Sequence, residues 1–432
     1  MNIDKLYALI NKEEGERVCK GIDAQACKKA PRNYFLIMFS NMLTSLGDTL
    51  SNPKTVLAWL MNFVNAPVYL ISFIVPIRES GSMLPQIAIA SLVRKKEIRK
   101  WIYVIGSILQ SAAIASIGWI GLHFKGQEAG WFMIIALVLF SLSRSLCSVA
   151  SKDVLGKTIP KTRRGRLKGY TSSVSGILVL LAGVFMLVQS KKDQDVSFYS
   201  TIIFFAASLW LIAALIYAFI KEFPGDTRSD SNGLKEAFSK ISLIKTNKNF
   251  RHFILARSLL LCSALSAPYY VLLAQEYLGN ESFLLGLLII ANGVAAIISS
   301  PFWGTMADEG SHKVMAISGL MAAVLGLLLI SITTFSQELR SQYWLYPTAF
   351  FFLGIAHSGV RLGRKTYIVD MANGNERTDY VATSNTLIGL ILLITGGISA
   401  LVSVFSVEGI ILALSISGVL GAMVSARLPK VE

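Results

Sequence analysis

The chain has 432 residues, of which 53% are hydrophobic and 16% are charged, and its mean hydropathy is +0.56. Soluble domains average about 25% charged residues. Charge this sparse, beside apolar stretches of membrane-spanning length, excludes a typical soluble protein and indicates a polytopic membrane protein.

The net charge of +15 would suit a nucleic-acid-binding protein, but the distribution of the charge argues against that class. Lys and Arg gather in three loops, at residues 94–100, 161–168 and 235–251, whereas the loops between them carry little positive charge. This alternation follows the positive-inside rule. We therefore expect an integral, multi-pass protein of a bacterial inner membrane, with the basic loops and both termini in the cytoplasm.

Residues 1–33 form a polar leader without the apolar core of a cleavable signal peptide, and the four cysteines do not indicate a disulfide framework. The first span is expected to begin near Tyr34 and carries Asn41 and Asp48 as part of a polar stripe. The tripeptide Asn52-Pro53-Lys54 predicts a break on the outer side of the membrane. Trp59 then fits an outer interfacial anchor.

The second span is expected at residues 66–93 and contains the string V-P-I-R-E-S-G-S-M-L-P-Q at 75–86. Arg78 and Glu79 lie side by side near its middle, among Pro76, Gly81 and Pro85. A charge at mid-bilayer costs roughly 2.5–3.5 kcal/mol, and such charges usually face a protein interior or a water-filled cavity. We interpret this pair as functional; a structural ion pair between neighbouring helices is the alternative.

The remaining spans are expected at about 101–123, 131–150, 169–189, 198–220, 253–277, 283–306, 314–334, 343–369, 380–405 and 407–426. The fold class is therefore an all-α membrane protein of about twelve transmembrane helices in two pseudo-symmetric six-helix bundles. We assign these bundles to residues 34–220 and 252–427. A cytoplasmic linker with an interfacial helix occupies 221–251, and a cytoplasmic tail occupies 428–432.

The two halves repeat each other. Lys152 aligns with Lys365, an ungapped offset of 213 residues. The same offset relates Ser145 to Ser358, Arg164 to Arg377, Gly176 to Gly389, Gly183 to Gly396 and Lys100 to Lys313. Duplicated halves are characteristic of secondary transporters, whose substrate site lies where the repeats meet.

The segment from Gly304 to Lys313 reads G-T-M-A-D-E-G-S-H-K. It resembles the signature loop G-x-x-x-D-x-x-G-R-K of the major facilitator superfamily, with Gly304, Asp308, Gly310 and Lys313 matching and His312 in place of Arg. The resemblance implies a gating role on the cytoplasmic side for Asp308, Lys313 and Gly304. In the first half the loop is degenerate, because Ser91, Lys95, Arg99 and Lys100 occupy the corresponding positions and a lysine replaces the acid.

Two arginines are too deep in their spans to reach the interface easily, Arg78 and Arg144. At the 213-residue offset Arg144 corresponds to His357, and Arg361 follows on the same span. Because the guanidinium fork binds carboxylate or phosphate bidentately, we predict a site for a small anionic or zwitterionic solute formed by Arg78, Arg144, His357, Arg361 and Asn41. A buried structural histidine is the alternative for His357. By contrast, Arg257 and Arg364 are expected to extend to the interface from helix ends.

Glu79 and Asp48 are the titratable candidates for proton coupling, although Glu79 is also a candidate partner for Arg144. Arg164 and Arg377 are expected to form salt-bridge latches between the halves, with simple orientation charge as the alternative. No metal site or cofactor is expected, and the chain contains no G-x-x-x-x-G-K-[ST] loop that would indicate ATP-driven pumping.

We therefore predict a secondary active transporter that works by alternating access and is coupled to protons, rather than an enzyme. Drug or toxin efflux is one alternative, disfavoured because the fifth span lacks the proline of the G-P-x-G-G motif of the family's drug–proton antiporters. A non-transporting or lipid-handling protein on the same fold is the other. The expected partners are a small-molecule substrate, the lipid bilayer and a proton or other coupling ion, but no nucleic acid, and the chain is expected to be a monomer.

Overall fold

The computed structural model describes residues 3–11, 19, 22–188, 195–225, 227, 243–371 and 376–431, and the regular structure in these ranges is entirely helical. The interfacial helix expected within 221–251 lies largely outside the described residues. The first half contains α1 (Ile3–Asn11), α2 (Ala24–Leu50), α3 (Val56–Phe63), α4 (Val68–Met83), α5 (Gln86–Arg94), α6 (Lys100–His123), α7 (Gly126–Thr158), α8 (Lys161–Val188) and α9 (Val196–Ala218). The second half contains α11 (Leu243–Thr246), α12 (Lys248–Leu259), α13 (Cys262–Leu265), α14 (Ala267–Leu278), α15 (Ser282–Phe335), α16 (Gln337–Arg340), α17 (Leu345–Asp370), α18 (Glu376–Ser403) and α19 (Val407–Ala426).

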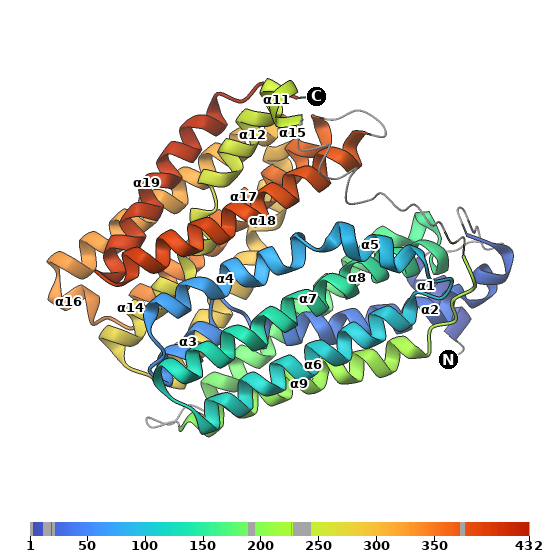
Figure 1. The fold of residues 1–432 in the computed structure, drawn as a ribbon, viewed down its shortest axis with the longest axis horizontal. Helices are drawn as coiled ribbons and strands as arrows, with labels where there is room; N and C mark the ends of the chain where they lie inside the picture. Colours follow the sequence, from blue (N-terminus) through green and yellow to red (C-terminus); the bar gives the residue numbers. More distant parts are fainter. Residues whose placement is uncertain are drawn as a thin grey trace.

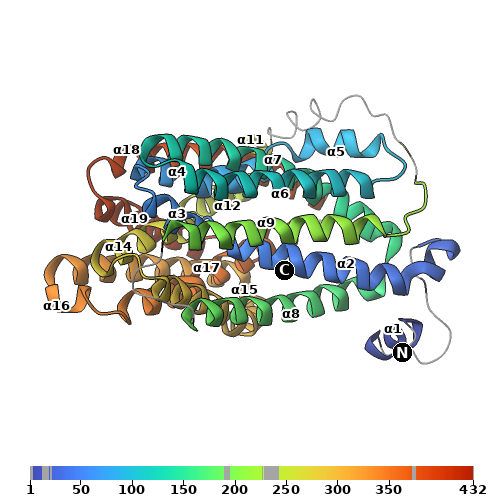
Figure 2. The ribbon, with the colours of Figure 1, turned by 90° about the horizontal axis from the view of Figure 1, so that it is seen from below.

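The helices form two groups that converge at one end of the molecule and spread apart at the other (Figure 1). The convergent end carries α3, α14 and α16, and the spread end carries α5, α11 and both termini. Seen from below, α2, α6, α8 and α9 run lengthwise along the first group, and α1 lies apart near the spread end (Figure 2).

Nine stretches of the described chain are long and apolar enough to cross a membrane. Two of the nine stretches belong to one long element, α15, and they meet at a non-helical kink at Gly310. Helices α2, α4 and α17 are not among the nine, and they are the helices that carry Asp48, Arg78 and Arg361. Charged interior side chains lower the hydropathy of these three helices, whereas α7 and the stretch that contains α12 remain apolar enough despite Arg144 and Arg257.

The two halves touch through reciprocal glycine contacts. A Cβ on Gly183 of α8 would lie 2.6 Å from Ile290 of α15, and a Cβ on Gly396 of α18 would lie 2.6 Å from Pro76 of α4. Gly183 and Gly396 are equivalent at the 213-residue offset, and each permits its helix to approach the other half closely. Reciprocal contacts of this kind are what a pseudo-twofold axis between duplicated halves produces.

The break expected at Asn52-Pro53-Lys54 is present, between α2 and α3, but the chain continues beyond it toward the convergent end. Val64 marks the end of the span instead, because its backbone oxygen accepts a hydrogen bond of 2.7 Å from Gly126 N in the turn between α6 and α7. Trp59 is fully buried, so it is not an interfacial anchor. The first span instead continues through a break into α3, which leaves Lys54 ten residues, or about 15 Å if helical, inside that end. The seventh span is broken similarly, between α12, α13 and α14.

The leader is more ordered than its polar composition indicates. Helix α1 buries Tyr7 and Asn11, and Arg163 of α8 donates to the backbone oxygen of Asn11 at 2.9 Å. Cys19 and Cys27 are joined by a disulfide, which the sequence did not indicate.

Candidate functional site

Asp48 of α2 binds two arginines at once. Its Oδ1 accepts from Arg78 of α4 at 2.8 Å and from Arg144 of α7 at 2.5 Å. Arg78 is 7% exposed and stacks over the Phe140 ring at 4.1 Å, whereas the Arg144 side chain is 36% exposed. The triad therefore joins three helices of one half, and Arg144 is the arginine that remains open to solvent.

Glu79 is next to Arg78 in sequence but does not join this triad. Its carboxylate makes no ion pair within 4.0 Å among the described residues, so the expected pairing with Arg144 is absent there. The cations that act on it electrostatically are Lys54, Arg364, Arg78 and Arg144, in that order. Glu79 is therefore a half-buried acid held among positive charges without being locked to one of them.

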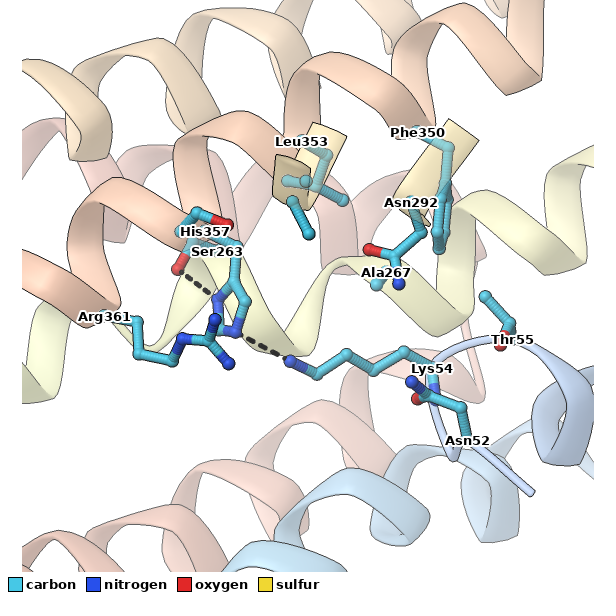
Figure 3. A pocket seen from close by; sticks show the side chains of 13 residues that line it. Asn52, Lys54, Thr55, Ser263, Ala267, Asn292, Phe350, Leu353, His357 and Arg361 are labelled. Atoms are coloured by element: carbon cyan, nitrogen blue, oxygen red, sulfur yellow. Dashed lines mark hydrogen bonds between the residues drawn. The ribbon is translucent and has the colours of Figure 1, made fainter. Parts of the chain in front are cut away.

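A cavity of about 150 Å³ lies between the halves next to His357 of α17. Lys54 enters it from the break between α2 and α3, and its Nζ lies 2.9 Å from His357 Nε2 (Figure 3). Ser263 Oγ lies 3.3 Å from Nδ1 of the same ring. Figure 3 shows the Arg361 guanidinium beside the imidazole, turned toward the Lys54 ammonium, with Asn292 on the far wall.

Because an ammonium group can only donate, Nε2 of His357 accepts from Lys54 and Nδ1 carries the proton toward Ser263. The histidine is thus neutral in this arrangement. It connects a lysine of the first half to a serine of the second.

A second cavity of about 280 Å³ adjoins the first along α17. Its lining includes Arg361 and Lys365, one helical turn apart, and Trp303 of α15. Ala296, Ser358 and Arg361 line both cavities. Neither lining contains an Asp or Glu.

Two further arginines, Arg257 and Arg364, lie in the interior near the cavities. Arg257 of α12 is 6% exposed and donates to Ser384 Oγ at 2.5 Å and Asn385 Oδ1 at 3.0 Å, so the expectation that it extends to the interface is wrong. Arg364 of α17 is half-buried and acts on Glu79. Around the triad and the two cavities, the interacting charges of the described residues are seven cations, Lys54, Arg78, Arg144, Arg257, Arg361, Arg364 and Lys365, and two acids, Asp48 and Glu79.

Of the expected substrate-binding residues, the structure brings His357 and Arg361 together at the cavity and Arg78 and Arg144 together at Asp48. Asn41 lies two turns before Asp48 on the same face of α2, about 10 Å toward the spread end. The sequence did not identify Lys54 as a site residue, because the tripeptide Asn-Pro-Lys is equally typical of a turn at the membrane surface. The available signal was a lysine only six residues beyond Asp48, too close for the span to have ended.

The expected gating residues lie toward the spread end. A Cβ on Gly304 would meet nothing within 4 Å, and Lys313 is exposed after the Gly310 kink. Arg164 donates to the backbone oxygens of Ile159 and Gly156, within its own half. The side chains of Asp308 and Arg377 lie outside the described residues, so both latches stay predictions.

An ionic cluster near the spread end of the first half involves a residue that sequence reasoning placed in the linker, Glu222. Its carboxylate accepts from the backbone N–H groups of Arg99 and Lys100 at 2.9 and 2.7 Å and from Lys157 Nζ at 3.0 Å. Arg99 also pairs with Asp153 at 2.9 Å. The degenerate first-half loop is thus anchored by acids from elsewhere in the chain.

Two groups of membrane-length helices around a charged interior are typical of membrane transporters. Residues 260–432 match the family model described as Major Facilitator Superfamily. An uncharacterized MFS-type transporter of Methanocaldococcus jannaschii is 23% identical over 376 residues, covering 84% of this chain and 86% of that protein. The second half of the chain is thus similar to the major facilitator superfamily, and the apolar helices indicate an integral, multi-pass membrane protein.

Solved transporter structures share the fold at low sequence identity. The inward-open xylose transporter XylE from E. coli superposes with a TM-score of 0.66 at 13% identity, covering 92% of this chain and 96% of that one. A POT family transporter in complex with 5-aminolevulinic acid gives 0.70 at 10% identity, covering 92% and 97%. A nucleoside transporter gives 0.64 at 11% identity, covering 91% and 98%. At these identities the likeness concerns the fold.

Proposed function

We propose that this transporter carries a small anionic solute across the membrane by alternating access. The observation that carries the proposal is the charge around the triad and the cavities: among the described residues, seven cations against two acids leave a surplus of five positive charges. Interior charges at membrane depth are costly unless compensated, and a bound anion supplies compensation.

Several cations in and around the cavities are available to a ligand. Arg361 and Arg364 make no ion pair or hydrogen bond with the described residues, and Arg361 is exposed to the cavity. Arg144 keeps part of its guanidinium open while it holds Asp48. Arginine binds carboxylate and phosphate oxygens through a planar fork and keeps its charge at every relevant pH. This balance favours an anionic over a zwitterionic solute, and it disfavours efflux of cationic drugs.

The arrangement of the halves supports alternating access. They meet in the interior through Lys54 and His357, and at the convergent end through Tyr199, whose hydroxyl donates to the backbone oxygen of Asn280 at 2.6 Å. We assign the spread end to the cytoplasm, from the basic loops that lie there, and the membrane to the bacterial inner membrane. Rocking of one half against the other would then expose the cavity on the opposite side.

We assign proton coupling to Glu79 and Asp48, with a monomer as the working unit. Glu79 is the stronger candidate, because its carboxylate is unlocked and faces cations from both halves. Protonation of Glu79 would remove the negative charge that acts on Lys54 and Arg364, and so would strengthen the attraction of the site for an anion.

The direct test is uptake of labelled organic and inorganic anions into proteoliposomes with an imposed pH gradient. Wild-type protein should accumulate an anion, Arg144→Gln should lose most of this uptake, and the exposed loop variant Lys125→Gln should behave as wild type. Glu79→Gln should still exchange anion but not respond to the gradient. Undiminished uptake by Arg144→Gln would remove that residue from the site, and uptake of neutral or cationic solutes alone would refute the proposal.

A further inference from the structure

Building on the proposed anion transport, we propose that the pocket between Lys54 and Arg361 receives a doubly charged group, so that the preferred substrate is a small dianion. Lys54 then serves as a substrate-binding residue that the first half of the molecule supplies to a pocket of the second half. The class includes dicarboxylates and divalent oxyanions such as hydrogen phosphate.

The pocket is built from both halves. Asn52 and Lys54 come from the break between α2 and α3, while Ser263, Asn292 and Arg361 come from three elements of the second half. A continuous helix would carry its backbone past this position, so the break is what brings the Lys54 ammonium to α17. A ligand held here contacts both halves and would couple its own binding to their relative position.

Most hydrogen-bond donors in the pocket have no acceptor among the described residues. Lys54 gives one N–H to His357 and keeps two, and Arg361 keeps all five because it has no hydrogen bond or ion pair in the described chain. The Asn292 amide also makes no hydrogen bond with described residues. The lining contains no carboxylate that could accept from these groups. Two cations with unused donors, the half-buried Lys54 and the cavity-exposed Arg361, fit a ligand rich in anionic oxygens.

The local charge sets the valence of that ligand. The residues that line the pocket include two cations, Lys54 and Arg361, and no acid among the described residues. The lining therefore carries two positive charges. The Asp48 triad lies on the first half with its own internal pairing. A dianion therefore neutralises the pocket, whereas a monoanion leaves one cation uncompensated in a low-dielectric interior.

His357 is a positioning residue in this scheme. His357 Nε2 holds the Lys54 ammonium in place, and the contact of Ser263 Oγ with Nδ1 fixes the tautomer of the histidine. The cavity of Trp303 and Lys365 continues past Arg361 along α17, which gives an anion a path lined by Lys365, then Arg361, then Lys54.

The experiment compares succinate with succinamate, which has nearly the same shape and one charge less, by equilibrium binding to the purified full-length protein. Inorganic phosphate and sulfate form separate arms that distinguish oxyanions from dicarboxylates. Wild type should bind at least one dianion about tenfold or more tightly than the monoanion. Lys54→Gln should abolish that preference, Lys54→Arg should retain it, and Lys125→Gln should match wild type.

Three results would overturn the inference. Equal affinity of wild type for monoanion and dianions would remove the valence argument, while leaving anion transport intact. Retention of the preference in both Lys54→Gln and Arg361→Gln would move the site elsewhere. Failure of every anion, of either valence, to bind would refute the proposed function as well. If Lys54→Gln does not fold, the Arg361→Gln variant carries the same comparison.

Discussion

Lys54 and His357 are 303 residues apart in sequence, yet their side-chain nitrogens lie 2.9 Å apart across the boundary between the two halves. Each residue lies in the interior of its half, one in a helix break and the other in the middle of α17. The contact therefore joins the charge of one half to the hydrogen-bonding network of the other. It accounts for both the position of the cavity and the neutral state of His357.

This contact predicts a difference between two substitutions of the histidine. His357→Gln keeps an acceptor for the Lys54 ammonium, whereas His357→Leu removes it. Leaving a buried donor without a partner costs about 1–3 kcal/mol, and because Lys54 is half-buried the loss should fall at the low end. Thermal unfolding in detergent should show a lower Tm for His357→Leu than for His357→Gln. Equal Tm values would mean that the contact contributes nothing to stability.

The Asp48 triad predicts an order of stability. Asp48→Asn leaves Arg78 and Arg144 facing each other without their shared acid, and removing one partner of a buried ion pair costs about 3–5 kcal/mol. The 26% exposure of Asp48 should reduce that cost. Arg144→Gln leaves the 2.8 Å pair of Asp48 and Arg78 intact, so it should unfold at a higher temperature than Asp48→Asn. The reverse order would show that Asp48 is not the organising charge.

Neighbouring glycines on α18 give a matched test of the interface between the halves. A Cβ on Gly396 would lie 2.6 Å from Pro76, whereas one on Gly397 would meet nothing within 4 Å. Overpacking costs about 1–3 kcal/mol, while alanine in a helix gains up to about 1 kcal/mol over glycine. Gly396→Ala should therefore lower the Tm, and Gly397→Ala should leave it unchanged or raise it. If both variants behave alike, α4 and α18 are not closely packed.

Glu222 should matter more than a neighbouring exposed acid. Glu222→Gln weakens three hydrogen bonds, two of them from the first residues of α6, and bonds to charged groups contribute about 1.5–3 kcal/mol. Glu97→Gln, on the exposed loop before α6, is the control. Hydrogen exchange at the start of α6 should accelerate in Glu222→Gln only. Unchanged exchange would exclude Glu222 as the cap of this helix.

The fold class could be predicted from the sequence, because apolar stretches of membrane-spanning length and the basic loops between them indicate a multi-pass membrane protein. Arg78 and Arg144 were identified as site residues because arginine at mid-bilayer is rare, and the structure brings both to Asp48. What the sequence could not supply was the pairing of these charges: Glu79 was one candidate partner of Arg144, whereas the structure pairs Arg144 with Asp48.

Lys54 and Glu222 show where local reading fails. Asn-Pro-Lys inside a membrane has the same composition as a surface turn, and only the contact with His357 distinguishes the two. Glu222 precedes Phe-Pro-Gly, which reads as the start of a linker, yet the side chain is fully buried beneath Lys157. Both residues owe their roles to partners more than sixty residues away.

The measurement that tests the central claim most directly is a thermal-shift screen of the purified wild-type protein against organic and inorganic anions, neutral sugars, nucleosides and organic cations. A ligand at a hundredfold excess over its Kd stabilises the native state by about 2.7 kcal/mol. The account predicts that small anions raise the Tm, that higher ionic strength weakens the shift, and that Arg144→Gln reduces it. A shift with sugars, nucleosides or cations but with no anion would contradict it.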